Sequence, residues 1–578
     1  MTREPLRENS FSSDQQQQRQ AVMRSSKVLQ LWRIRPRASY GIYCGKGQRP
    51  IGQCGYCTSC ATTDTIHARA NPTSNALTDH RHLGVDQELF TTSIYSPGSP
   101  LFLPKGARMF NKLTNFLRAQ YEHFGFQEVI TPTIYKKSLW EKSGHWENYA
   151  EDMYSVTGRG ASGETKERQN GQDEEYGLKP MNCPGHCLLF ASKQRSYRDL
   201  PIRYADFSPL HRNEISGALS GLTRVRRFHQ DDGHIFCRPC QIRDEISRTL
   251  DFVKLTYKIL GLGPYRLALS TRPKDQFIGT VEEWDNAEEA LKLSLNDSGL
   301  EWTLNEGDGA FYGPKIDIIL KDSDGKEHQT ATIQLDFQLP KRFELEYQTP
   351  APELEAKGMI AEVANKSQGP ATPVLIHRAV LGSVERIMAL LIEHYQSRWP
   401  FWLSPRQVII LTVNDDRQIV EFARHAARVI SGYETLYAPG DFTSKEIRAS
   451  HFQGASISVE VDDSPRPLGK KLSEAKRKRY GVVAIVGRDN FNSKKLTVDI
   501  SGIPDNGKVI CCDEILRIEV AQEKAMRDGG IHRPGAAAEK QLHKSSLPPA
   551  LLPGELKKIT ISPLKLREVL TGLERAFV

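Results

Sequence analysis

The chain has 578 residues, of which 39% are hydrophobic, so its length allows roughly two to four domains with cores of their own. Lys and Arg number 78 against 70 Asp and Glu, and the formal net charge of +8 suits a polyanionic partner or a solvated basic surface. Ten cysteines in a chain of this length do not indicate a disulfide framework, and their uneven placement favours a reducing compartment, with a few possible metal ligands. No run of about 18 apolar residues predicts a transmembrane helix, so no membrane association is expected.

The N-terminal extension, residues 1–76, differs from the rest of the chain in charge. From Gln15 to Thr63 it has no Asp or Glu, while arginines accumulate. An acid-poor, amphipathic segment with Arg and Ser is typical of a mitochondrial transit peptide. We therefore expect the protein to be located in the mitochondrial matrix. The alternative is that it stays in the cytoplasm and that this segment is a basic tail that contacts RNA. Four cysteines here are spaced too tightly for an ordinary zinc ribbon, and no role is assigned to them: Cys44, Cys54, Cys57 and Cys60.

Residues 77–402 are predicted to form one α+β domain, with an antiparallel sheet and flanking helices. Its order of segments is not the regular βαβ alternation of a Rossmann fold. Residues 157–177 are rich in Gly, Glu and Gln and are expected to form an exposed loop. Periodicity and turn residues predict helices Ala107–Phe124 and Val380–Tyr395, strands Gln127–Thr131, Ile316–Leu320, Ala331–Phe337 and Val374–Ile376, and a turn at Asp322–Gly325.

Residues 403–578 are predicted to form a smaller α/β domain with a largely parallel sheet, because strands and helices alternate. An irregular insert near 503–553 precedes a closing helix at Leu564–Phe577. The strands are expected at Val408–Val413, Ile457–Val461 and Val482–Val486, and the helices at Arg417–Ile430 and Leu468–Arg479.

A first group of candidate site residues suits a nucleotide. Arg212 and Glu214 are two residues apart, so a strand would point both side chains to one face. An Arg fork can hold an α-phosphate, and a Glu can accept from the adenine amino group. Phe228 offers a ring for stacking. Taken alone, this pattern is more often a surface ion pair.

A second group suits a metal and a phosphate chain. Cys183, His234 and His377 are zinc-type ligands, and three protein ligands with one open position form the catalytic zinc pattern. Spacing rules cannot join residues so far apart in the chain, so this grouping depends on the family resemblance given below. Each of them alone is more often a buried core residue. Arg386 follows a helix start at Gly382 and Ser383, where free N–H groups can face phosphate. The alternative there is an ordinary amphipathic helix.

Seven blocks of sequence resemble those of threonyl-tRNA synthetases, within the class II aminoacyl-tRNA synthetases, and occur in the same order. The resemblance runs from about Asp79 to about Ile500. Seryl, prolyl and glycyl relatives share the architecture but lack the first block with its cysteine. The blocks are MNCPGH (181–186), SYRDLPIR (196–203), HRNE (211–214), QDDGHIFC (230–237), GAFYGPKID (309–317), IQLDF (333–337) and HRAVLGSVER (377–386).

The resemblance implies a ligase that makes threonyl-adenylate from L-threonine and ATP and then loads tRNA(Thr). It implies Zn²⁺ on Cys183, His234 and His377, Mg²⁺ with the ATP, and a homodimer with Pro132 at the interface. Threonine would meet Gln230, Asp232 and Tyr312. ATP would meet Arg212, Glu214, Arg224, Phe228, Gln334 and Arg386, with Arg212, Lys315 and Arg386 assisting the reaction.

One departure from the family pattern, one basic stretch and two alternative functions complete these expectations. Many members carry an N-terminal editing domain, whereas only about ninety residues precede the catalytic region here, so we expect no such domain and poor hydrolysis of seryl-tRNA. Lys470, Lys471 and Lys476–Arg479 form a basic stretch that is expected to meet tRNA phosphates. The alternatives are a cytosolic enzyme and an inactive synthetase-like accessory protein, and the complete set of arginines and metal ligands disfavours the latter.

Overall fold

The computed structural model describes residues 79–157, 175–274, 277–322, 325–356, 368–432, 457–511, 514–515 and 559–577. The N-terminal extension with its four cysteines lies outside these ranges, as do most of the loop expected at 157–177 and most of the insert near 503–553. Among the described helices, none combines the length and the apolar character that a membrane span requires.

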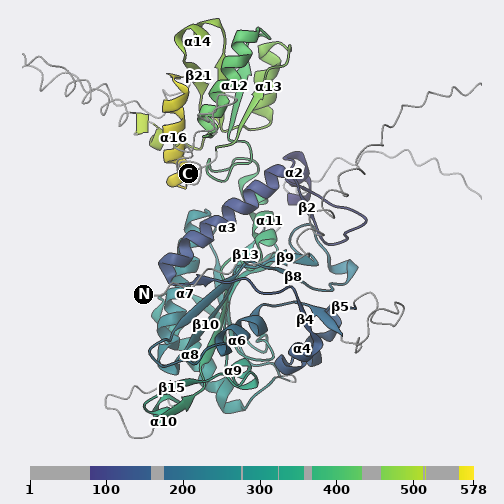
Figure 1. Cartoon of the computed structure of the whole chain (residues 1–578), viewed down its shortest axis with the longest axis vertical. Helices are drawn as coiled ribbons and strands as arrows, with labels where there is room; N and C mark the ends of the chain where they lie inside the picture. The colour runs from purple at the N-terminus through teal and green to yellow at the C-terminus, as the bar shows by residue number, and fades with distance from the viewer. Residues whose placement is uncertain are drawn as a thin grey trace, which may run out of the picture. The chain divides into compact units, whose positions relative to one another are not determined.

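An eight-stranded sheet forms the centre of the larger part of the chain (Figure 1). Its strands pair antiparallel except for β11 with β12 and β3 with β7. In spatial order they are β12 (Trp302–Asn305), β11 (Arg266–Ser270), β13 (Lys315–Lys321), β14 (Glu327–Asp336), β17 (Val374–Ala379), β10 (Asp232–Cys237), β7 (Ile202–Asp206) and β3 (Gln127–Glu128). The predicted antiparallel α+β architecture is thereby confirmed.

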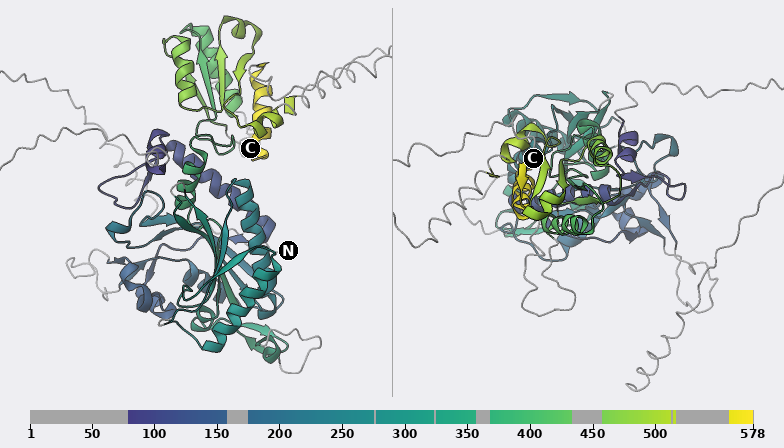
Figure 2. Two further views of the ribbon diagram at one scale, coloured as in Figure 1. Left: turned by 180° about the vertical axis from the view of Figure 1, so that it is seen from behind. Right: turned by 90° about the horizontal axis from the view of Figure 1, so that it is seen from above.

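Helices cover both faces of this sheet. The long helices α7 (Ile242–Ile259) and α8 (Val281–Asp297) lie together against one face (Figures 1 and 2). The shorter helices α6 (Cys183–Ala191) and α9 (Gln338–Arg342) share a second apolar cluster with Phe236 on the opposite face. Because side chains alternate along a strand, β10 sends Ile235 and Cys237 to the α7 side, and Asp232, His234 and Phe236 to the α6 side.

Two helices end or begin where their caps dictate. Helix α3 (Pro104–Phe124) opens on a proline and stops at Gly125, whose φ of 75° places it in the left-handed region. Helix α11 (Val384–Tyr395) starts four residues later than predicted. The N–H groups of Val380 and Leu381 are donated to the Asp231 carboxylate, and the Ser383 hydroxyl caps the helix by accepting from the N–H of Arg386.

The remaining elements of this part are short. Arg212 and Glu214 lie just beyond the end of β8, not on a strand as predicted, because the pairing with β9 stops at His211. The short elements of this larger part are α2 (His80–Asp86), β1 (Phe90–Thr91), β2 (Leu101–Phe102), β4 (Ile134–Lys136), α4 (Lys137–Ser143), α5 (His145–Tyr149), η2 (Ala150–Asp152), β5 (Ser155–Val156), β6 (Tyr176–Leu178), β8 (Pro209–His211), η3 (Ser216–Ala218), β9 (Arg227–His229), η4 (Pro239–Gln241), β15 (Tyr347–Thr349), α10 (Pro352–Ala356) and β16 (Gly369–Ala371).

The C-terminal part holds a five-stranded sheet in the order β19-β18-β20-β21-β22. Its first three strands are parallel and the last two antiparallel, so the largely parallel sheet predicted is in fact mixed. The strands are β18 (Val408–Thr412), β19 (Val459–Asp462), β20 (Val482–Val486), β21 (Leu496–Asp499) and β22 (Ile559–Ile561), and the helices are α12 (Arg417–Ser431), α13 (Leu468–Arg477), α14 (Arg488–Ser493) and α16 (Pro563–Arg575).

Candidate active site

A cavity of about 440 Å³ opens over the α6 side of the central sheet. Its walls come from β9, β10, β13, β14, β17, the starts of α6 and α11, and the segment that follows β8. All thirteen residues that the sequence analysis nominated line this one cavity, although the role of each remains a prediction: Cys183, Arg212, Glu214, Arg224, Phe228, Gln230, Asp232, His234, Tyr312, Lys315, Gln334, His377 and Arg386.

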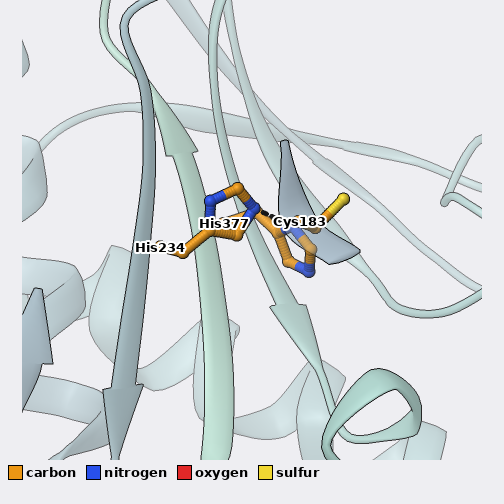
Figure 3. Close-up of side chains that lie close together, drawn as sticks. All are labelled: Cys183, His234 and His377. Carbon is orange, nitrogen blue, oxygen red and sulfur yellow. Dashed lines mark hydrogen bonds between the residues drawn. The ribbon is translucent and has the colours of Figure 1, made fainter. Parts of the chain in front are cut away.

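One end of the cavity gathers three soft ligand atoms. His234 on β10 and His377 on β17 are direct partners in the antiparallel register, so their side chains lie on the same face of neighbouring strands. Cys183 is the first residue of α6 and comes from the opposite wall (Figure 3). The ligand atoms of all three residues lie within 4.8 Å of one another.

The chemistry of this group fits a zinc ion. Tetrahedral Zn²⁺ with nitrogen and sulfur ligands needs donor atoms about 3.3–3.8 Å apart, which atoms inside a 4.8 Å limit can meet. Burial lowers the pKa of His234 well below its usual value, so the imidazole is neutral and able to coordinate. Burial also raises the pKa of the Cys183 thiol, and a bound cation would favour the thiolate instead.

A second cluster of His, Asp and Glu does not fit a metal. Both ring nitrogens of His80 are engaged, Nδ1 with Glu393 Oε1 at 2.7 Å and Nε2 with the N–H of Leu222 at 3.1 Å. The Asp79 carboxylate caps α2 and pairs with Arg81. This cluster ties α2 to the loop after η3 and to α11, and the histidine has no ring nitrogen left for an ion.

Polar groups beside the three ligands suit a small amino acid. Asp232 is buried on the same face of β10 as His234, and burial raises the pKa of its carboxyl group. Its Oδ2 accepts from the N–H of Asn182 at 3.4 Å. The ring of Tyr312 lies 5.2 Å from that of His377, measured between centroids. Gln230 completes this end of the lining.

The other end of the cavity is cationic. The Arg212 guanidinium lies 5.1 Å from the centre of the Phe228 ring, and its buried Nε has no hydrogen-bond partner within the part of the chain described. Arg386 donates to the carbonyls of Thr223 at 3.0 Å and Gln329 at 2.8 Å. Burial, and then the charges of Arg212 and Arg224, lower the pKa of Arg386. This mutual repulsion would be relieved by a polyanion.

Three further nominated residues already have protein partners. Arg224 pairs with Glu214, with 2.7 Å between Nη2 and Oε2. Lys315 lies 2.8 Å from the Asp317 carboxylate. The Gln334 side-chain amide donates to the Gly313 carbonyl at 3.2 Å, which holds it along the floor of the cavity.

Some residues at the site were not found from the sequence. His186 and Asp336 contact the outer nitrogens of the two histidine ligands. The signals for His186 were its place at the end of the MNCPGH block and its spacing, one helical turn after Cys183. Behind the cavity lining, His145 contacts Met181, which lines the cavity. It is fully buried and hydrogen-bonded to the Ser143 hydroxyl at 2.8 Å, and burial lowers its pKa to about 3.

One expectation outside the cavity is wrong. Lys471 was expected to meet tRNA phosphates, but its side chain is buried and donates to the carbonyls of Thr412 at 2.9 Å and Asp462 at 3.1 Å. The helical period turns this lysine inward, whereas its neighbour Lys470 is exposed.

Comparison with known proteins agrees with this architecture. Residues 165–395 match the family model of the tRNA synthetase class II core domain (G, H, P, S and T), and residues 407–502 match the anticodon binding domain. The fold and the cavity therefore define a class II tRNA synthetase core followed by an anticodon-binding domain.

Individual relatives identify which family within this class the chain resembles. The chain is 46% identical over 422 residues to the mitochondrial threonine–tRNA ligase of Saccharomyces cerevisiae, covering 71% of this chain and 84% of that protein. It is 45% identical to the cytoplasmic threonine–tRNA ligase 1 of Bos taurus, of which it spans only 54%. The crystal structure of the RNA binding domain of threonyl-tRNA synthetase from Cryptosporidium parvum matches with a TM-score of 0.62 and 44% identity, over 73% of this chain and 92% of that one. The chain belongs to the threonyl-tRNA synthetase family.

Proposed function

We propose that this chain activates L-threonine with ATP and transfers it to tRNA(Thr), with a Zn²⁺ ion on Cys183, His234 and His377 as the selector of the amino acid. The proposal rests on the two unlike ends of one cavity, a cationic end and an end with three metal-type ligands. To form an adenylate, the carboxylate of the amino acid must lie next to the α-phosphate of ATP. A cavity that binds the amino acid at one end and the phosphates at the other suits that geometry.

At the cationic end, Arg212 is the proposed contact of the α-phosphate and Arg386 that of the γ-phosphate. Phe228 would stack on adenine and Glu214 would accept from its amino group, with Arg224, Lys315 and Gln334 around the phosphates and ribose. Synthetases of this class use ATP with Mg²⁺. The threonine carboxylate attacks the α-phosphorus and pyrophosphate leaves, so the arginines act by holding the phosphates in line and by balancing the developing charge.

At the other end, Asp232 is proposed to accept from the threonine hydroxyl, with Gln230 and Tyr312 lining the pocket. When bound, zinc would coordinate the amino group and hydroxyl of threonine and so reject valine, which lacks the hydroxyl, by about 10⁴ or more. Serine keeps the hydroxyl and loses only a methyl group, worth roughly 1–3 kcal/mol. The proposed domains are 77–402 for catalysis and 403–578 for the anticodon.

Two further proposals concern assembly and location. A homodimer through the segment around Pro132 is supported by the exposed apolar side chains of Ile130 and Ile134 beside it. Sedimentation of an Ile130→Asp variant as a monomer, against a wild-type dimer, tests this. The mitochondrial matrix is supported by the acid-poor residues 15–63 and by the name of the yeast relative. Imaging a fluorescent fusion with and without residues 1–76 tests that location.

The decisive experiment compares wild type with Cys183→Ser and a matched control. Metal content and threonine-dependent ATP–pyrophosphate exchange are measured on the same preparations. We expect one zinc per chain in the wild type, and loss of both zinc and exchange in Cys183→Ser. Cys187→Ser is the control, because Cys187 is buried one turn later on α6 and does not line the cavity. Retention of zinc and exchange by Cys183→Ser contradicts the proposal.

A further inference from the structure

Three imidazoles form a hydrogen-bonded row through the metal-type end of the cavity, between two buried carboxylates. His377 Nε2 lies 2.8 Å from Asp336 Oδ2, and His377 Nδ1 lies 2.9 Å from His234 Nε2. His234 Nδ1 in turn lies 2.8 Å from His186 Nδ1. Beyond the row, His186 Nε2 stands 3.9 Å from Asp206 Oδ2. All five side chains are buried.

Each nitrogen–nitrogen contact needs one hydrogen and one lone pair, and a neutral imidazole supplies one of each. The Asp336 carboxylate can only accept, so His377 carries its proton on Nε2 and presents a lone pair at Nδ1. His234 then donates from Nε2 and accepts at Nδ1, and His186 donates from Nδ1. This order leaves a lone pair on His186 Nε2. That atom is buried without a hydrogen-bond partner among the described residues, which is compatible with this order.

In this arrangement the proton of His234 sits on Nε2, the nitrogen that faces His377 and the proposed metal position. A ligand nitrogen must present a lone pair, so metal binding requires the tautomer with the proton on Nδ1. That tautomer donates to His186 Nδ1, and His186 must then carry its own proton on Nε2. The number of protons does not change, but in each of the two rings, His234 and His186, the nitrogen that donated now accepts and the other nitrogen carries the proton.

The shifted proton of His186 would face Asp206, which is a fixed acceptor. Its Oδ2 accepts from the N–H of Thr131 at 3.1 Å and from the Thr131 hydroxyl at 2.7 Å. Its Oδ1 accepts from the N–H of Ser208 at 2.7 Å. The ammonium group of Lys179 lies 3.7 Å away and balances the charge in this buried setting. Asp336 plays the corresponding role for His377, anchored by the N–H groups of Gln338 and Leu339.

We propose that His186, backed by Asp206, selects the tautomer of His234 that can bind zinc and thereby sets the metal affinity of the site. His186 is a positioning residue and touches neither substrate nor reacting atoms. The inference rests on the zinc site proposed above. Partners that orient a metal-ligating histidine typically contribute 10- to 100-fold in metal affinity. The alternative is that His186 only fills space against Tyr204 and His234.

The test uses the full chain and competition for Zn²⁺ with a chromophoric chelator. We expect His186→Leu, which removes the acceptor, to weaken zinc binding 10- to 100-fold, and His186→Asn, whose amide oxygen can replace Nδ1 as acceptor, to stay within about threefold of wild type. Phe190→Leu is the packing control on the same helix, because Phe190 is buried and stacks on Phe236. It should lower the melting temperature and leave zinc affinity unchanged.

A second readout separates positioning from packing. At limiting zinc, His186→Leu should raise the KM for threonine in pyrophosphate exchange while leaving the KM for ATP within about twofold. If His186→Leu does not fold, Asp206→Ala, which removes the acceptor for His186 Nε2, takes its place with the same expected direction. Wild-type zinc affinity in a folded His186→Leu protein, or in Asp206→Ala, overturns the inference. If wild type binds no zinc at all, the proposed function itself fails, which is a different result.

Discussion

Arg378 and Asp231 form an ion pair, with 2.8 Å between Nη1 and Oδ2, in which neither side chain is exposed. The guanidinium lies 4.1 Å from the centre of the Phe126 ring. The carboxylate also accepts from the N–H groups of Val380 and Leu381. The pair therefore holds the turn between β17 and α11, directly after His377 and before Arg386.

Removing one member of this pair should be costly. Asp231→Asn leaves a buried cation without its counter-charge, and we expect the free energy of unfolding to fall by about 3–5 kcal/mol. Arg378→Met combined with Asp231→Asn should recover part of the loss. Urea unfolding measures both. Arg118→Met is the control, since the Arg118–Glu128 pair is exposed and should contribute less than about 1 kcal/mol. If Asp231→Asn and Arg118→Met lowered the free energy of unfolding by the same small amount, a structural role for the buried pair would be refuted.

Arg386→Gln should reduce pyrophosphate exchange by about 10²–10³, because removing a group that stabilises developing charge costs about that much. Arg266→Gln provides a control, since Arg266 is exposed at the start of β11 and pairs with the exposed Glu327. Steady-state kinetics at saturating threonine are the measurement. Exchange within threefold of wild type for Arg386→Gln would show that the phosphate chain is held elsewhere.

Replacing Lys471 should affect stability, whereas replacing its neighbour Lys470 should affect tRNA binding. Lys471→Ala leaves the carbonyls of Thr412 and Asp462 without their buried donor, and we expect it to destabilise the C-terminal domain by about 2–4 kcal/mol. Lys470→Ala should leave stability unchanged. If Lys470 contacts a phosphate, that change should weaken tRNA binding and reduce the slope of log K against log salt by about 1. Thermal unfolding and filter binding over a salt series separate the two. Equal melting temperatures for the two variants would argue against the buried contact.

The buried imidazole of His145 predicts part of the acid sensitivity. Its pKa of about 3 in the folded chain lies below the usual 6.5, so between these values the unfolded chain binds a proton that the native chain does not. Stability from this residue is therefore complete above pH 6.5 and declines as the pH falls toward 3. Between pH 7 and pH 5 the wild type should lose about 2 kcal/mol more than His145→Gln. Urea unfolding at both pH values measures this, with exposed His123→Gln as the control. Parallel losses in wild type and His145→Gln would disprove it.

Much of the fold follows from local patterns in the sequence. The apolar period of α3 and the glycine after it predicted the helix closely, and the strands β13 and β14 were also predicted, with a turn between them. The late start of α11 was not predictable, because it depends on Asp231, which is about 150 residues away in the chain. The burial of Lys471 against the Thr412 carbonyl and the end of β8 before Arg212 likewise depend on which segments pack against these residues.

The candidate site shows the same division. Its thirteen residues were nominated through a family resemblance, since spacing rules cannot connect ligands 143 residues apart such as His234 and His377. What the resemblance did not supply was the surroundings of the ligands. His186 and Asp206 are set opposite each other by the packing of α6 against β7, and no local pattern reports that packing.

The cross-strand pairing of His234 with His377 has a consequence for how the protein is assembled. Because side chains alternate along a strand, a slip of one residue between β10 and β17 would send one imidazole through to the α7 face. Such a misfolded sheet could keep its backbone hydrogen bonds, yet it would have no place for the ion. The zinc content of a refolded preparation would then report the fraction of molecules in which β10 and β17 pair in the correct register.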